Sequence, residues 1–276
     1  IETGKVKPSE DLQQSLWEAL ERFNPDAPLE MLFDYVRIRF PTTDVQQVVE
    51  NILQLKLSYF LHEDYGFYSY SEHYALGDIF VLCSHELDKG VLVELKGRGC
   101  RQFESYLLAQ QRSWYEFFMD VLVAGGVMKR LDLAINDKTG ILNIPVLTEK
   151  CQQEECISVF RSFKSYRSGE LVRKEEKECM GNTLYIGSLQ SEVYFCIYEK
   201  DYEQYKKNDI PIEDAEVKNR FEIRLKNERA YYAVRDLLVY DNPEHTAFKI
   251  INRYIRFVDK DDSKPRSDWK LNEEDR

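Results

Sequence analysis

The order of strand-like and helical stretches constrains the fold of this chain more than any other feature. A strand-like stretch (31–41) ends at a proline and precedes a helical pattern with apolar residues at every third or fourth position (45–55). Three short β-rich stretches (67–96), a second helical pattern (about 100–122) and another strand (127–137) follow. This order predicts an α+β fold, with a central antiparallel or mixed β-sheet and helices packed mainly on one face.

The second half of the chain repeats this succession of elements. A short helix after Pro145 precedes four strand-like stretches (157–226), and two helical stretches follow (228–239 and 244–256). No repeat of individual residues accompanies the succession. We therefore predict two similar strand–helix halves.

The composition favours a globular protein of the cell interior. Hydrophobic residues make up 43% of the 276 residues, which is enough to fill a core. The apolar runs are shorter than the roughly 18 to 20 residues that span a bilayer, and no basic and then apolar leader opens the chain. We expect a cytoplasmic protein with no membrane partner.

The cysteines and the known enzyme signatures exclude several classes of site. The six cysteines are spread out, which suits a reducing compartment, and the close pair of Cys151 and Cys156 lacks the second pair that zinc sites need. The sequence contains no G-x-G-x-x-G, Walker A, G-x-S-x-G or H-E-x-x-H motif. Nucleotide-binding and zinc-peptidase sites are therefore not expected.

The net charge of -11 argues against a nucleic-acid partner, because affinity for phosphate depends on Lys and Arg. One stretch (160–174) differs, since Arg161, Lys164 and Arg167 alternate there with aromatic residues. These three residues are candidates for binding a polynucleotide backbone. A solvated strand or loop face is the alternative interpretation.

Four of the strand-like stretches carry an acid or a phenol among apolar neighbours: Glu94, Asp132, Glu222 and Tyr198. If these strands are neighbours, their side chains converge. Three grouped carboxylates would repel one another unless a divalent cation neutralised them, and oxygen ligands favour Mg²⁺ or Mn²⁺. The alternatives are solvated acids and a tyrosine that packs in the sheet.

Four motifs in order, RLDLAIND, TLYIGS, FCIYEKD and RFEIRLKN, resemble the Rep_trans family over about residues 30–250. This family includes rolling-circle plasmid replication initiators and the MobT-type relaxases of integrative conjugative elements, and the chain is more similar to the latter. The resemblance implies a catalytic domain at 29–258. It also implies that 1–28 is a linker or helix after a helix-turn-helix domain, and that 259–276 is a polar tail or truncated connection.

The resemblance also implies the roles of individual residues. Tyr198, rather than Tyr185, is the expected nucleophile, and the expected ligands of a catalytic Mn²⁺ or Mg²⁺ are the three acids Glu94, Asp132 and Glu222. Lys200 and Arg224 are candidates for assisting catalysis, with plain surface cations as the alternative. One departure from the family pattern is that Asn136 and then Asp137 follow "LDLAI", so a fourth acidic ligand is not expected.

The function that the resemblance implies is a DNA relaxase. It nicks one strand at an origin of transfer or replication, leaves a 5′-phosphotyrosyl end, and so initiates conjugative transfer and rolling-circle replication, with a helicase or coupling protein as a further partner. The alternatives are a non-catalytic nucleic-acid-binding module that stacks bases on Tyr185, Tyr194 or Phe195, and an interaction protein with an acidic surface.

Overall fold

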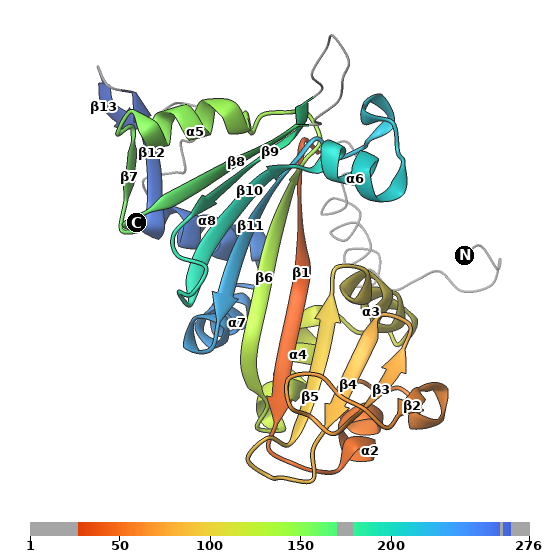
Figure 1. The fold of residues 1–276 in the computed structure, drawn as a ribbon. Coiled ribbons are helices and arrows are strands. Elements are labelled where there is room, and N and C mark those ends of the chain that lie inside the picture. The colour runs from red at the N-terminus through yellow and green to blue at the C-terminus, as the bar shows by residue number, and fades with distance from the viewer. Residues whose placement is uncertain (1–26, 170–178, 260–261, 266–276) are drawn as a thin grey trace, which may run out of the picture.

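A ten-stranded sheet forms the centre of the protein in the computed structural model, which describes residues 27–169, 179–259 and 262–265 (Figure 1). Every neighbouring pair of its strands is antiparallel. In spatial order the strands are β2 (Leu61–Glu63), β3 (Glu72–Leu76), β4 (Ile79–Cys83), β5 (Val91–Lys96), β1 (Leu29–Phe40), β6 (Val127–Asp137), β11 (Asn219–Lys226), β10 (Val193–Glu199), β9 (Cys179–Ile186) and β8 (Phe163–Gly169).

The helices are mostly short. They are α2 (Val45–Gln47), which continues as a π-helical turn (Val48–Ile52), α3 (Arg98–Ala109), α4 (Trp114–Val123), α5 (Ile144–Gln152), α6 (Lys200–Asn208), α7 (Glu228–Tyr240) and α8 (Pro243–Tyr254). None of the helices in the described part of the chain combines the length and apolar character needed to cross a bilayer.

The sheet consists of two halves with the same connectivity. In the first half β1 is followed by the meander β2 to β5, and β5 returns to pair with β1. In the second half β6 is followed by the meander β8 to β11, and β11 returns to pair with β6. A pair of helices follows each meander, α3 and α4 in the first half and α7 and α8 in the second. The prediction of two similar strand–helix halves is confirmed.

The two faces of the sheet differ in character. On one face alternate strand residues such as Val36, Leu133 and Ile223 are fully buried, and Figure 1 shows α4, α7 and α8 on this side. The next residues along these strands, such as Arg37 and Asp132, point to the opposite face, which we call the open face. The α+β prediction, with helices mainly on one face, is therefore confirmed, and the sheet is fully antiparallel.

The prediction of a single helix at about 100–122 is wrong, because this stretch forms two separate helices, α3 and α4. Ser113 starts α4 with a capping box, in which its side chain accepts from the Glu116 backbone N–H while the Glu116 carboxylate accepts from the Ser113 N–H. Because the chain turns between the two helices, Phe117 of α4 packs against Phe103 of α3, with ring centroids 4.8 Å apart. The Ser-x-x-Glu signature was present in the sequence and marks this boundary.

A second, smaller sheet lies beside the main one. Its strands are β13 (Asp262–Pro265), β12 (Ile255–Asp259) and β7 (Cys156–Ser158). The stretch predicted as one strand from about 157 therefore forms two strands, β7 in the smaller sheet and β8 in the main sheet. The predicted segment 1–28 lies outside the described residues except for its last two, and most of the predicted tail 259–276 lies outside them as well.

Asp137 closes the end of β6 and is fully buried. Its carboxylate accepts hydrogen bonds from the backbone N–H groups of Thr139, Gly140 and Leu142 and from the Asn219 amide, at 2.7 to 3.0 Å. Burial alone would raise the pKa of Asp137, but these hydrogen bonds outweigh it and lower the pKa below its ordinary value. This acid therefore holds the turn that follows β6 and does not reach the open face.

We expect Asp137→Ala to lower the free energy of unfolding by about 3 kcal/mol, because it leaves several buried donors without an acceptor. Since the folded-state pKa is lowered, the stabilisation by Asp137 is present above its unfolded pKa of about 3.9 and is lost as the pH falls through the folded value. Urea unfolding at pH 7 measures the loss, with the exposed Glu213→Ala as the control. Equal stability of the two variants would contradict the role of this carboxylate.

Candidate active site

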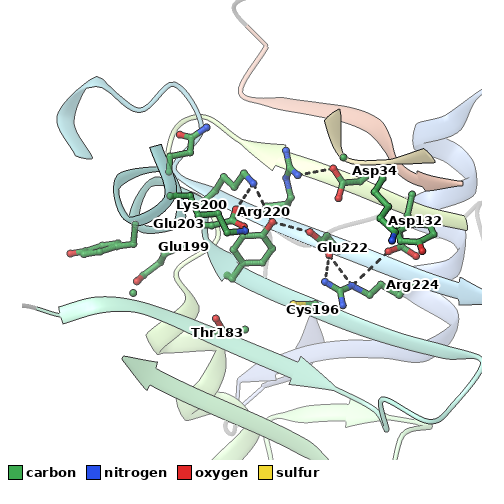
Figure 2. Close-up of a pocket in the computed structure, with 18 of the residues that line it drawn as sticks. Asp34, Asp132, Thr183, Cys196, Glu199, Lys200, Glu203, Arg220, Glu222 and Arg224 are labelled. Carbon is green, nitrogen blue, oxygen red and sulfur yellow. Dashed lines mark hydrogen bonds and ion pairs between the residues drawn. The ribbon is translucent and has the colours of Figure 1, made fainter. Parts of the chain in front are cut away.

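A pocket of about 920 Å³ opens over the open face and is lined by residues of both halves. It extends from Tyr35 on β1 to Tyr198 on β10, and residues of α6 line it as well. Figure 2 shows Lys200 and Glu203 from α6 at one side of this pocket, with Glu222 beyond them. The side chains that the sequence singled out as catalytic, Tyr198, Lys200 and Arg224, therefore all line this pocket.

Tyr198 lies at the end of β10, half-buried, and its hydroxyl donates a hydrogen bond of 2.8 Å to Oε1 of Glu222 on the neighbouring strand β11. Burial raises the pKa of Tyr198 far above its ordinary value near 10, and the negative charge of Glu222 raises it further. The phenol is therefore neutral at physiological pH. A base is needed to activate it, and the Glu222 carboxylate already contacts its proton.

Lys200 is the first residue of α6 and not the strand residue that the sequence suggested. Its Nζ lies 3.5 Å from the Tyr198 hydroxyl oxygen and also pairs with the Glu203 carboxylate. Its side chain is only 17% exposed. A positive charge thus lies next to the candidate nucleophile, held there by an acid of the same helix.

Arg224 connects two buried acids. Its Nε and terminal nitrogen lie 2.8 and 2.5 Å from Oε2 of Glu222, and Nε lies 3.8 Å from Oδ2 of Asp132 (Figure 2). Asp132 also accepts two hydrogen bonds from Arg130. Burial raises the pKa of Asp132 to about 6 against the opposing effect of both guanidinium groups, and the charge of Glu222 adds to the rise.

Asp132 and Glu222 have the chemistry of a site for a divalent cation. Both are hard oxygen donors with 3 to 4% of their side chains exposed, on neighbouring strands, and burial opposes the charge on Asp132 that a cation would neutralise. Two carboxylates leave coordination positions for substrate oxygens and water. These two residues therefore fit a Mg²⁺ or Mn²⁺ ion.

Glu94 does not join this pair. Its carboxylate accepts from the Tyr35 hydroxyl and from Arg37, and lies 2.7 Å from Nζ of Lys96. Strand β1 separates its strand from β6. Within the described residues, no three His, Cys, Asp or Glu side chains stand together in a way that would hold a metal ion. The structure therefore brings two of the three predicted ligands together.

The two-half organisation explains where Glu94 lies. Glu94 stands two residues before the end of β5 and Arg224 two residues before the end of β11, and each strand is followed by a residue of positive φ that leads into a helix. Glu94 lies opposite Arg37 of β1, and Arg224 lies opposite Asp132 of β6. The same cross-strand ion pair thus occurs in both halves with the charges exchanged, and Glu94 is the counterpart of an arginine.

Arg220, which the sequence did not single out, and Asn136 complete the site. Arg220 lies opposite Tyr198, and its guanidinium contacts Asp34 at 2.9 Å and the Asn136 side-chain oxygen at 2.8 Å. Asn136 therefore serves as a hydrogen-bonding partner on the open face where the family pattern has an acid. The signal for Arg220 was the alternation in RFEIRLKN, which places Arg220, Glu222 and Arg224 on one face.

The predicted basic patch is only partly directed to this face. Lys164 on the edge strand β8 lies opposite Tyr185, so both point to the open face, and Arg161 is exposed in the segment before β8. Arg167 is exposed, but three residues from Lys164 in a strand it points to the other face. Residues 170–174 of the patch lie outside the described residues.

The aromatic platforms expected for a non-catalytic binding module are mostly not exposed. Phe195 is fully buried against the helix side, and Tyr194 is 5% exposed beneath Arg224 and Lys226. Their assignment as base-stacking residues is therefore wrong. Tyr185 is half-buried on the open face, and burial raises its pKa to about 12.

Comparison with known proteins gives two family matches. The family described as Replication initiation factor matches residues 126–274, and the Rolling Circle replication initiation protein N-terminal domain matches residues 30–120. The border between the two matches falls near the end of α4 and the start of β6, where the two halves meet.

One relative and one solved structure are similar over most of the chain. The chain is 44% identical over 246 residues to a Bacillus subtilis (strain 168) protein titled "Putative DNA relaxase NicK", covering 89% of this chain and 69% of that protein. The rolling circle replication initiator protein from Geobacillus stearothermophilus matches with a TM-score of 0.71 and 26% identity, covering 88% of this chain and 91% of that one.

Proposed function

Because the chain belongs to the replication initiation factor (Rep_trans) family, we propose that it nicks one DNA strand at an origin of transfer or replication through a 5′-phosphotyrosyl intermediate on Tyr198. The resemblance inferred from the four motifs is thereby confirmed, and with it the class of nicking relaxases and rolling-circle initiators. The observation that carries the proposed mechanism is the 2.8 Å hydrogen bond from Tyr198 to Glu222 in the pocket.

The reaction is a transesterification. The phenolic oxygen of Tyr198 attacks the phosphorus of the scissile phosphodiester, and the P–O3′ bond breaks. The phenol proton passes to Glu222, which acts as the general base, and the leaving 3′ oxygen takes a proton from solvent. Because the raised pKa keeps the phenol neutral, proton removal accompanies the attack. One phosphodiester replaces another, so the strand can later be rejoined.

The cations around Tyr198 have separate roles. Lys200, 3.5 Å from the hydroxyl, binds a non-bridging oxygen of the scissile phosphate and stabilises the charge that builds during attack. Arg224 donates two hydrogen bonds to Oε2 of Glu222 and so orients the other carboxylate oxygen toward Tyr198. Arg224 is thus a positioning residue for the base.

Asp132 and Glu222 would hold the divalent cation, Mg²⁺ or Mn²⁺. When bound, such an ion polarises the phosphorus and neutralises charge on the phosphate oxygens. Glu94 is left out of this ligand pair because strand β1 lies between its strand, β5, and β6, which carries Asp132.

We expect excess EDTA to reduce nicking to background, and added Mn²⁺ or Mg²⁺ to restore it, because the ion that Asp132 and Glu222 would hold neutralises the charge that builds on the phosphate during attack. Thermal melting gives a readout that does not depend on activity. The ion should raise the melting temperature of the protein, since it binds the folded state, and should raise it less for Asp132→Asn. Nicking that continues unchanged in EDTA would contradict the assignment.

DNA leaving the site on the β8 side would pass Lys164 and Arg161. Both are exposed, and Lys164 points to the same face as Tyr185 and the pocket. We propose that these two residues bind the phosphate backbone there, with Arg167 contributing only from the opposite face. A helicase or coupling protein remains a predicted partner.

The proposed function is tested on a supercoiled plasmid that carries the cognate origin. Nicking should give relaxed circles and a protein–DNA adduct that survives detergent. In the nicked product the 3′ end should be extendable by a polymerase, and the 5′ end should resist labelling by a kinase even after protease digestion, because the tyrosine stays esterified to the 5′ phosphate. A free 5′ end, or an adduct on the 3′ end, would contradict the mechanism.

A further inference from the structure

The open face of the first half carries cations stacked on aromatic rings. The guanidinium carbon of Arg37 lies 4.4 Å from the ring centroid of Tyr68, and that of Arg130 lies 3.9 Å from the ring centroid of Tyr35. Lys96 donates a 3.3 Å hydrogen bond to the Tyr68 hydroxyl. All of these residues except Arg130, which belongs to the adjoining strand β6, lie in the half of the sheet that does not carry Tyr198.

The acids on this face lie beneath the cations. Glu94 and Asp132 each have 3% of their side chains exposed, whereas Arg37 and Arg130 are 23% and 22% exposed and Lys96 is 51% exposed. Solvent therefore meets the outer edges of the cations and not the carboxylates. The face can attract phosphate although the whole chain carries a net charge of -11.

Tyr68 is held in place by a loop of unusual backbone conformation. Tyr68 and Ser69 have φ values of 55° and 64°, a region that non-glycine residues rarely adopt. The following residues fix the loop, since the Tyr70 hydroxyl donates to the Lys89 carbonyl and the Ser71 N–H to the Cys83 carbonyl. The Tyr68 ring packs on Arg37 and still leaves 52% of the residue exposed.

This row of cations and rings leads toward the nucleophile. The strands from β5 to β10 lie in the order β5, β1, β6, β11, β10, so the row crosses four inter-strand spacings, or about 19 Å. On β10 the residue in register with Tyr35, Asp132 and Arg224 is Tyr194, and Tyr198 lies four residues, or about 13 Å, further along that strand. Arg130 and Arg224 meet at Asp132 in the middle of it, and both line the pocket that contains Tyr198. A DNA strand that follows the row and then continues along β10 therefore reaches Tyr198 without leaving the open face.

We propose that this row, which we call the first-half track, binds the single-stranded DNA on one side of the nick; its residues are Tyr35, Arg37, Tyr68, Lys96 and Arg130. The inference rests on the proposed function and names how its substrate is held. The cations contact phosphates, and the exposed Tyr68 ring stacks on a base. A duplex keeps its bases stacked on one another, so only a single strand can use that ring.

The test measures the binding of a fluorescent oligo(dT) of about 30 nucleotides by anisotropy, with a duplex of equal length as the comparison. We expect Tyr68→Ala to weaken oligo(dT) binding about 5- to 100-fold, as loss of one stacked base does. Tyr68→Phe keeps the ring and should bind within about two-fold of the wild type, and duplex binding should change little in either variant. The matched control is Tyr232→Ala, which removes an equally exposed tyrosine from α7 on the far side of the sheet.

A second variant, Lys96→Gln, tests the first-half track independently in case Tyr68→Ala does not fold. Lys96→Gln should reduce the slope of log affinity against log salt concentration by about 0.7, the value for one lost phosphate contact with a single strand. Oligo(dT) affinity that is the same in Tyr68→Ala and Tyr232→Ala, or an unchanged salt slope in Lys96→Gln, would overturn the track. Binding needs no cleavage, so a protein that binds through Tyr68 and never nicks origin DNA would instead overturn the proposed function.

Discussion

Tyr198→Phe is expected to lower the rate of nicking at least about 1,000-fold, because it removes the hydroxyl that attacks the phosphate in the proposed mechanism. The fold should be unaffected, since the ring stays in β10 and Glu222 keeps its two hydrogen bonds from Arg224. Affinity for origin DNA should also remain. Relaxation of supercoiled plasmid and the yield of the covalent adduct measure the loss, and a binding assay on the same preparation shows that the protein is intact.

Tyr185→Phe is the matched control for this variant. Tyr185 lies on the neighbouring strand and lines the same pocket, and its change to Phe removes the same hydroxyl, but this hydroxyl hydrogen-bonds the Cys196 thiol and the ring contacts Tyr166. We expect it to nick within a few-fold of the wild type. If Tyr185→Phe were inactive and Tyr198→Phe active, the assignment of the nucleophile would be reversed.

The second large effect is expected for Glu222→Gln, which should slow nicking about 100- to 10,000-fold, the usual contribution of a general base. The amide has the same shape and can still accept a hydrogen bond from Tyr198, but it cannot take the proton. Its loss of charge also weakens the pair of acids that would hold the cation. Single-turnover nicking at saturating Mn²⁺ measures the chemical step and separates it from DNA binding.

Glu94→Gln makes the same chemical change at the position that pairs with Arg37 in the other half. Because the amide can still accept from Tyr35 and Arg37, and Glu94 lies beyond β1 from the nucleophile, nicking should fall less than about 10-fold. A loss as large as that of Glu222→Gln would restore the three-acid metal site that the family resemblance implied. The comparison of these two variants therefore decides between two and three carboxylate ligands.

Much of the architecture was predictable from local patterns. The alternation in RLDLAIND and RFEIRLKN placed Asp132 and Glu222 on one face of their strands, and the structure makes these strands neighbours. The repeated succession of elements predicted two halves without any residue-level repeat. In both cases the information lies in short-range periodicity, which a single sequence contains.

The parts that could not be predicted depend on contacts between distant segments. Glu94 has the same alternating context as Asp132, and only the strand order shows that β1 lies between their strands. Likewise, the loop that brings Tyr68 onto Arg37 has positive φ values at Tyr68 and Ser69. Neither residue is a glycine, so the sequence does not indicate this backbone conformation. The break before α4 is different, since Ser113 and Glu116 carry a recognisable start signal.

The pairing of β1 with β6 has a mechanical consequence. This ladder runs from Leu29 opposite Asp137 to Arg39 opposite Val127 and joins the two halves into one continuous sheet. Halves joined in this way cannot move apart by a hinge motion, because such a motion would break the backbone hydrogen bonds between β1 and β6. In the proposed complex, the distance between the DNA held by the first-half track and the scissile phosphate is therefore fixed by the positions of the strands in one continuous sheet, and we expect the cleaved end to leave along the open face.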